Sequence, residues 1–464
     1  MTSESINPDT PPASPWSIFW IASMAVFLVS IDTTVLFAGF NKILLSFPKS
    51  SAADVSWVLN AYTIVYATML IPAGGIADKF GRKKIFMLGV LVFLLASLGC
   101  GAATSVTWLI GARILQAIGA SLLSPASLSL ILEAFPQNKR AVAVSSWGAV
   151  GALAAALGPG LGSFIIDTAG WQWAFYLNIP IGLICLWRGI TLLKESINPR
   201  DKIRFDLIGM LLLIFAIGAI TFGIVEFNSP HWTKPELMQL ILLGLLLIFV
   251  FIGWAKYKKN PLVDLTLFEN RTFRYANCAG LTIGIAFSIM FFAFFFWMTS
   301  IWHYSLPMAG IAVTPGPLTV IPFAIIGGRI AGRIGHRPLL ITGCLTYALS
   351  GLWYMFVPDQ NVSYFTHWLP GLFLSGMSVG LVMPSLSAAA VHGLPAKDYA
   401  IGSAINQAIR QIGMVMGVAI TILLLAHPNL QLVDFKKAYL CHVILSLLSA
   451  VLVLPVNTRP KSKR

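Results

Sequence analysis

Two ionisable side chains, Asp32 and Arg113, interrupt apolar stretches of the sequence long enough to cross a membrane. An acid inside such a stretch is costly, because it needs a partner, water or a proton, and it marks a functional site by default. At about 1.5 Å per helical residue, Asp32 lies about 12 Å and Arg113 about 9 Å from the expected outer ends of their helices. We therefore expect the two charges to pair and to form a proton-coupling site, with a static ion pair as the alternative.

The elements that must position these charges are apolar helices. The 464 residues are 57% hydrophobic and 10% charged, against about 25% charged residues in soluble domains. Runs of about 20 apolar residues predict about fourteen spans, the first at 17–40 and the last at 437–456. Because short alternating strands are missing, the pattern predicts an all-α polytopic membrane protein and not an outer-membrane barrel.

The formal net charge of +14 comes mainly from Lys and Arg in alternate loops. This asymmetry orients membrane proteins with their basic loops inside, so we expect both termini in the cytoplasm and no nucleic-acid partner. The location expected is a bacterial cytoplasmic or inner membrane. No cleavable signal peptide is apparent. The five cysteines lack metal-ligand spacing, and no nucleotide-binding loop or zinc motif occurs. We expect no enzyme activity, no metal and no cofactor besides a proton gradient.

Two loops of the chain repeat one another. Residues 74–83 read GGIADKFGRK and residues 328–337 read GRIAGRIGHR, which align without a gap. Repeated halves with a pathway between them are a transporter architecture. The domains expected on this basis are a cytoplasmic tail 1–16, a six-helix bundle 17–193, two inserted helices 205–256, a cytoplasmic linker 257–275, a second six-helix bundle 276–456 and a basic tail 457–464.

Several motifs resemble those of one transporter family. The segments are GGIADKFGRKK at 74–84, RILQAIG at 113–119, GALAAALGPGLG at 151–162, WQWAFYLNIPIG at 171–182, DLIG at 206–209 and PLVDLTLF at 261–268. Over nearly its whole length the chain resembles the major facilitator superfamily and, within it, the fourteen-span drug:proton antiporters. The resemblance implies two six-helix bundles with two extra central helices, and proton-driven efflux of drugs, including antibiotics.

The resemblance also implies roles for two of these segments. Asp78, Gly81 and Arg82 would form a conformational latch, with a loop that only orients the helices as the alternative. In the second copy Gly332 replaces Asp78, so a latch would exist on one side only. The helix-packing antiporter motif comprises Gly151, Gly158, Pro159 and Gly162. Its glycines let helices approach closely and its proline allows a bend; Ser163 stands where glycine is usual.

The substrate-cavity candidates are polar or aromatic residues expected near the pathway: Gln116, Trp57, Tyr62, Phe292, Phe295, Asn406 and Arg410. Consecutive residues cannot share a helix face, so only some of the aromatics of 291–297 would line a cavity. The second half has no deep acid, which makes strongly dicationic substrates poor candidates. Monocationic, neutral and anionic compounds stay open, the last because of Arg410.

The function expected is a proton-driven antiporter that exports amphipathic organic compounds such as drugs, dyes, biocides or toxic metabolites by alternating access. The alternative is a proton-coupled uptake or export carrier for one specific metabolite, and transport direction would decide between uptake and export. A channel or membrane enzyme has less support, because no filter repeat or catalytic constellation occurs. We expect a monomer whose partners are the substrate, protons and the bilayer, with an envelope adaptor protein as an open partner.

Overall fold

The computed structural model describes residues 14–136, 140–196, 206–228, 232–394, 399–425 and 430–458, and within these the regular elements are all helical. Thirteen stretches of the described chain are long and apolar enough to span a membrane, and α5 is a further 30-residue helix. The all-α polytopic class expected from the apolar runs is confirmed, whereas the domain boundaries stay a prediction.

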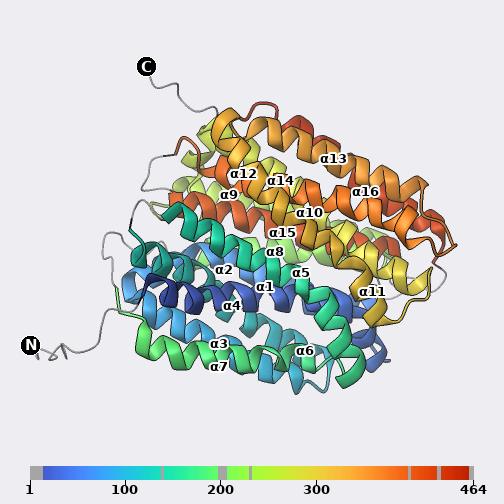
Figure 1. The fold of residues 1–464 in the computed structure, drawn as a ribbon, viewed down its shortest axis with the longest axis horizontal. Helices are drawn as coiled ribbons and strands as arrows, with labels where there is room; N and C mark the ends of the chain where they lie inside the picture. Colours follow the sequence, from blue (N-terminus) through green and yellow to red (C-terminus); the bar gives the residue numbers. More distant parts are fainter. Residues whose placement is uncertain are drawn as a thin grey trace, which may run out of the picture.

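The first half of the chain forms one helical group, drawn in blue to green in Figure 1. Its members are α1 (Pro15–Ser46), α2 (Ala52–Phe80), α3 (Arg82–Gly101), α4 (Val106–Ala134), α5 (Arg140–Ala169), α6 (Trp173–Tyr176) and α7 (Asn178–Leu192). Within it α1 packs on α5, and α4 packs on both α2 and α3. Ser51 and Asp54 form a capping box that starts α2 by satisfying free backbone amides.

The second half repeats this packing, in yellow to red. Its members are α10 (Arg271–Ser300), α11 (Leu306–Val313), α12 (Pro315–Ile334), α13 (Arg337–Phe356), α14 (Leu369–Val391), α15 (Tyr399–Leu425) and α16 (Leu432–Leu452). Here α10 packs on α15, and α14 packs on α12 and α13. The correspondence of α1, α2, α3, α4 and α5 with α10, α12, α13, α14 and α15 matches the repeat in the sequence.

Two helices lie between the halves in sequence, α8 (Leu207–Val225) and α9 (Lys234–Tyr257). They pack tightly on one another, because a Cβ at Gly223 would lie 3.0 Å from the Leu237 oxygen and one at Gly244 would lie 2.7 Å from the Ala216 oxygen. On its other side α8 contacts α2 of the first half and α15 of the second. The hairpin therefore lies along the seam between the two halves.

Asp206 fixes this hairpin at one end. Its carboxylate is 2% exposed and accepts hydrogen bonds from the backbone amides of Gly209 at 3.0 Å and Leu262 at 3.1 Å, and from the indole of Trp254 at 2.9 Å. The first bond caps α8, while the other two hold the end of α9 and the segment after it.

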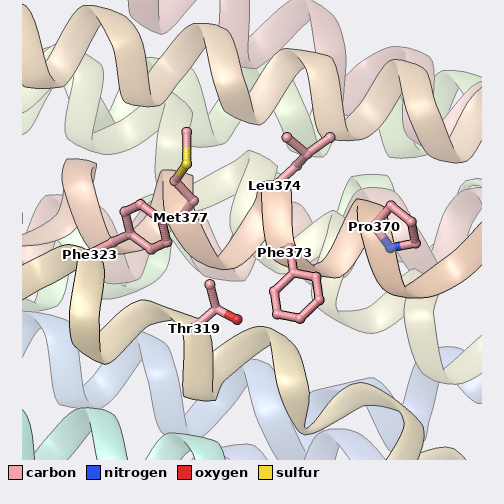
Figure 2. Close-up of a pocket in the computed structure, with 6 residues that line it drawn as sticks. All are labelled: Thr319, Phe323, Pro370, Phe373, Leu374 and Met377. Atoms are coloured by element: carbon pink, nitrogen blue, oxygen red, sulfur yellow. The ribbon is translucent and has the colours of Figure 1, made fainter. Parts of the chain in front are cut away.

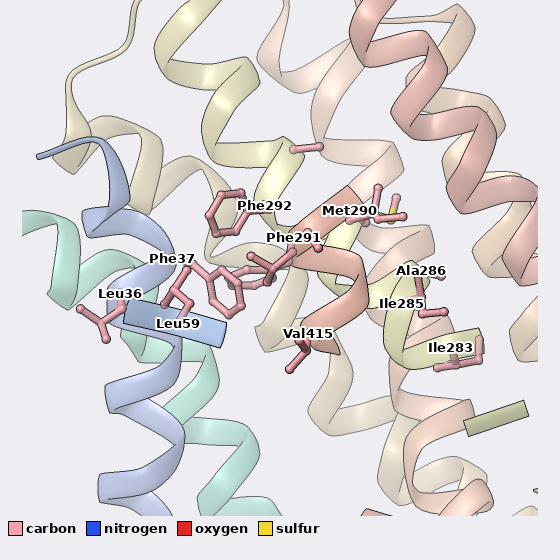
Figure 3. Packing of buried hydrophobic residues seen from close by; sticks show 14 of the residues in the cluster. Leu36, Phe37, Leu59, Ile283, Ile285, Ala286, Met290, Phe291, Phe292 and Val415 are labelled. Atoms are coloured by element: carbon pink, nitrogen blue, oxygen red, sulfur yellow. The ribbon is translucent and has the colours of Figure 1, made fainter. Parts of the chain in front are cut away.

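The halves also meet away from the α2–α15 seam. We call the end of the bundle that holds the start of α1 and the loops before α3 and α13 the basic end (Figure 1). Near the opposite end, Phe37 of α1 packs on Phe291 and Phe292 of α10, with ring centroids 5.4 and 5.3 Å apart, and Phe40 packs on Phe292 at 5.3 Å. Figure 3 shows Phe37 pointing toward the two rings of α10. These side chains form an aromatic contact between the halves.

The outer surface of the bundle carries many exposed apolar side chains, as a lipid-facing surface requires. One hollow of about 490 Å³ between α12 and α14 is almost wholly apolar. Figure 2 shows its lining: Thr319, Phe323, Pro370, Phe373, Leu374 and Met377. Because this lining has no charged group, the hollow offers no chemistry for coupling.

Candidate functional site

Asp32 and Arg113 form an ion pair inside the first half. Asp32 is in the middle of α1 and Arg113 is two turns into α4. Each is 1% exposed, and Nη1 of Arg113 donates to Oδ2 of Asp32 at 2.5 Å. The sequence predicts similar depths in the membrane for Asp32 and Arg113, and the structure shows the two side chains in contact. Each charge offsets part of the cost of burying the other. Their role in proton coupling stays a prediction.

Three uncharged side chains complete the carboxylate's surroundings. Amide groups of Gln116 and Asn178 donate to Oδ1 of Asp32 at 2.8 and 3.0 Å. The same two amides lie 2.8 and 3.3 Å from the Ser97 hydroxyl oxygen. All three side chains are fully buried. We call Asp32, Arg113, Gln116, Asn178 and Ser97 the buried polar network; it joins α1, α3, α4 and α7.

The guanidinium of Arg113 has further partners. Its Nε donates to the backbone oxygen of Val58 on α2 at 3.0 Å, and its Nη1 also donates to the Gln116 side-chain oxygen. The Tyr62 ring lies 3.8 Å from the guanidinium carbon, a cation–π distance. Arg113 is thus held by α1, α2 and α4 together, and Asp32 would change its partners if it took up a proton.

The glycines of α5 bring α5 against α1, the helix that carries Asp32. A Cβ at Gly158 would lie 1.9 Å from Oγ1 of Thr34, and one at Gly162 would lie 2.7 Å from Val35. Gly151 has a looser contact, 3.2 Å from Val26. Glycine is therefore required where the two helices touch most closely, within one turn of Asp32.

The other side of α5 contacts the second half. A Cβ at Gly310 of α11 would lie 2.4 Å from the backbone oxygen of Pro159. The Ser163 hydroxyl donates to the same oxygen at 2.6 Å. Pro159 lies inside α5, and because it has no amide hydrogen it removes one helical hydrogen bond. Helix α5 is therefore packed between α1 and α11, with its proline at the junction.

The loop at the basic end has a different set of contacts. Gly81 joins α2 to α3 with φ +110°, a left-handed conformation that favours glycine. The Glu195 carboxylate accepts from the backbone amides of Lys83 and Lys84, both at 3.2 Å. Arg82 lies 3.5 Å from Glu133. The side chain of Asp78 is outside the described residues, so its part in a latch stays a prediction.

The aromatic cavity candidates lie in different surroundings. Tyr62 is 2% exposed beside Arg113, and Phe292 and Phe295 are 1% and 3% exposed within α10. Trp57 is partly exposed and lies 6.2 Å from Phe222 of α8. Phe292 belongs to the aromatic contact between the halves. Of the four, Trp57 is the one that the structure leaves partly exposed.

The remaining polar candidates lie on α15. Asn406 is 2% exposed and donates to Asn277 of α10 at 3.1 Å. Arg410 is partly exposed, one turn further along. Between them, Gln407 donates to the hydroxyl of Tyr66 on α2 at 3.1 Å, so this bond crosses from one half to the other.

Sequence reasoning missed several members of these groups. It did not single out Ser97, Tyr66, Gln407 or Glu195, and it cited Asn178 only as part of a family motif. Ser97 and Asn178 are polar residues within otherwise apolar runs, a signal that could have marked them as partners of Asp32. Gln116, expected in the substrate cavity, belongs to the buried polar network in this structure.

Comparison with known proteins identifies a family and similar sequences. The model of the Major Facilitator Superfamily matches residues 22–300 and 276–464. The multidrug resistance protein Stp of Mycobacterium tuberculosis is 30% identical, with 86% of this chain and 73% of that protein covered. The multidrug transporter protein MdtP of Bacillus subtilis is also 30% identical, over 85% of this chain and 72% of that protein.

Among solved structures, a D-xylose–proton symporter resembles the fold with a TM-score of 0.66. Its sequence is 16% identical, and the match covers 97% of this chain and 98% of the symporter. At that identity the likeness concerns the fold alone.

Proposed function

The chain belongs to the Major Facilitator Superfamily, and from this premise we propose that it is a proton-driven antiporter that exports amphipathic organic compounds across the cytoplasmic membrane. Its relatives named as multidrug proteins support the substrate class. The observation that carries the proposal is the ion pair of Asp32 and Arg113, because an ionisable acid in a membrane interior marks a proton or ion pathway.

The buried polar network supplies a site at which one proton changes several contacts. Ionised Asp32 accepts from Arg113, Gln116 and Asn178. Protonation would remove the charge that holds Arg113 and convert one carboxylate oxygen into a donor. The neighbouring amides would then have to rearrange, and the balance between two arrangements of α1, α4 and α7 would shift.

The glycine contacts connect this local change to the other half. Helix α1 carries Asp32 and lies directly on Gly158 and Gly162 of α5, while Pro159 of the same helix lies against α11. A displacement of α1 would thus be passed through α5 to α11 of the second half, and alternating access requires the two halves to move relative to one another. The aromatic contact of Phe37 and Phe40 with α10 is the part that would open toward the outside.

The function is tested in everted membrane vesicles that contain the full chain. A panel of fluorescent dyes and toxic compounds is supplied outside, and a pH gradient, acidic inside, is imposed. We expect at least one compound to accumulate in the vesicles, and an uncoupler to abolish the accumulation. A gradient that drives compounds only out of everted vesicles would indicate uptake in the cell, and accumulation that is independent of the gradient would refute proton coupling.

A further inference from the structure

Arg410 is a second cation in the membrane interior, and its surroundings differ from those of Arg113. It is eleven positions after the first residue of α15, about 16 Å along the helix axis and far from either end. Arg113 is 1% exposed and paired with a carboxylate. Arg410, in contrast, is partly exposed, so its side chain is accessible from a space within or beside the bundle.

The guanidinium of Arg410 has no counterion in the described part of the chain, where no ion pair or hydrogen bond joins it to another residue. From 270 to 433 the sequence holds only two acids, Asp359 and Asp398. Asp359 lies between α13 and α14, and Asp398 is outside the described residues. The deep acid, Asp32, already accepts from three side chains of the first half. A charge in the membrane interior without a counterion is unfavourable, which makes this position suited to a ligand that brings one.

Polar and aromatic groups of both halves lie around Arg410. Gln407 precedes it by three positions and therefore shares its helix face. Gln407 donates to Tyr66, whose hydroxyl also lies 3.0 Å from the Ser124 hydroxyl. The rings of Tyr62 and Tyr66 stack with centroids 6.0 Å apart. A ligand at this position would contact the Arg410 guanidinium of the second half and the tyrosine rings of the first half.

We propose that Arg410 binds the acidic group of the exported compound, and that the preferred substrates are organic anions with an apolar aromatic body. This inference rests on the proposed export function and names its substrate class. The planar guanidinium matches a carboxylate or sulfonate with two parallel hydrogen bonds. Gln407 and Tyr66 would orient the bound group, and the tyrosine rings would contact the aromatic body. A cationic compound would meet repulsion from Arg410 and a carboxylate that is already occupied.

The sign of the substrate charge has a measurable consequence. Exchange of one outgoing monocation for one incoming proton moves no net charge. Exchange of an outgoing anion for an incoming proton moves two positive charges inward, so an inside-negative membrane potential drives it. Export of the preferred substrate would therefore respond to the potential at constant pH.

The experiment uses the purified full chain in liposomes and three probes with one aromatic body: pyrenebutyrate, pyrenebutanol and the pyrenebutyl trimethylammonium ion. We expect the wild type to bind the carboxylate about tenfold more tightly than the alcohol, the gain typical of a charge-assisted hydrogen bond. Arg410→Gln should remove this preference, so that the carboxylate binds no more tightly than the alcohol; measurable alcohol binding also shows that the variant is folded. Arg410→Lys should retain part of it. The control Arg188→Gln, on the exposed surface of α7, should behave like the wild type.

Two results would overturn the inference: tighter binding of the cation than of the carboxylate, or a carboxylate preference that survives in Arg410→Gln. Proton-driven export of the cationic probe alone would refute the anion site while the export function stands. Carboxylate binding that depends on Arg410, without transport of any probe by a pH gradient, would refute the export function while the site stands.

Discussion

The contact of Gly158 with Thr34 gives the sharpest test of how α5 packs on α1. In Gly158→Ala the new methyl carbon would lie 1.9 Å from Thr34 Oγ1 and 2.8 Å from its Cβ, well inside the normal contact distance of about 3.5 Å. The Thr34 side chain or the two helices must shift at this point, and overpacking of this kind costs about 1–3 kcal/mol. Gly111→Ala is the matched control, because a Cβ there meets nothing within 4 Å; alanine in an open helical position stabilises by up to about 1 kcal/mol.

The assay follows thermal unfolding in detergent by the reaction of a fluorescent maleimide with cysteines that are buried in the native state, Cys100, Cys185 and Cys344. We expect Gly158→Ala to unfold at a lower temperature than the wild type, and Gly111→Ala at the same or a higher temperature. Adding Thr34→Ala to Gly158→Ala should recover part of the loss, because the hydroxyl oxygen is removed while the Cβ remains. If Gly158→Ala is as stable as Gly111→Ala, the close approach of α1 and α5 is wrong.

Three further predictions concern the ion pair, the inserted hairpin and the loop before α13. Arg113→Leu should destabilise the chain by about 3–5 kcal/mol, since it leaves a buried carboxylate unpaired, and Asp32→Asn in the same chain should recover much of this in the maleimide assay; additive losses would contradict the pairing. Asp206→Ala removes the acceptor of several hydrogen bonds and should speed proteolysis next to α9, whereas the exposed Asp54→Ala should not. Burial and the nearby His392 lower the pKa of His336, so the stability that neutral His336 contributes is present above its ordinary pKa of about 6.5 and is lost as the pH falls through the folded value. His336→Gln should flatten this acid-side fall of the unfolding temperature, and an unchanged pH profile would refute the assignment.

The fold class could be predicted from the sequence because the bilayer limits the choices. Apolar runs of about 20 residues have few alternatives to spanning helices, and the repeat of 74–83 at 328–337 indicated two related halves. The number of inserted helices followed from the spacing of that repeat. The position of α8 along the α2–α15 seam could not be predicted, because a helix that is apolar on all sides does not show which face packs on its neighbours.

The pairing of Asp32 with Arg113 could be predicted because the depth of a residue in the membrane follows from its position along a helix of known rise per residue. Their other partners did not, because Ser97 and Asn178 come from α3 and α7, and the rotation of those helices depends on packing that the sequence does not encode locally. Gln116 shows the same limit. It is one turn from Arg113, so the sequence places both on the same side of α4. Only the structure shows that Gln116 belongs to the buried polar network and not to the substrate cavity. The sequence indicated Arg410 only because it is a charged residue inside an apolar run. Its differences from Arg113, a partly exposed side chain and no carboxylate partner among the described residues, could be seen only in the structure.

The most direct test of the account is whether Asp32 carries the proton. Wild type and Asp32→Asn are compared in liposomes that hold a preformed pH gradient, with Asp167→Asn as control because Asp167 forms an exposed ion pair with Lys42 at 3.1 Å. The account predicts that substrate dissipates the gradient through the wild type and the control, whereas Asp32→Asn exchanges labelled for unlabelled substrate but moves no protons. Dissipation of the gradient by Asp32→Asn at the wild-type rate would contradict it.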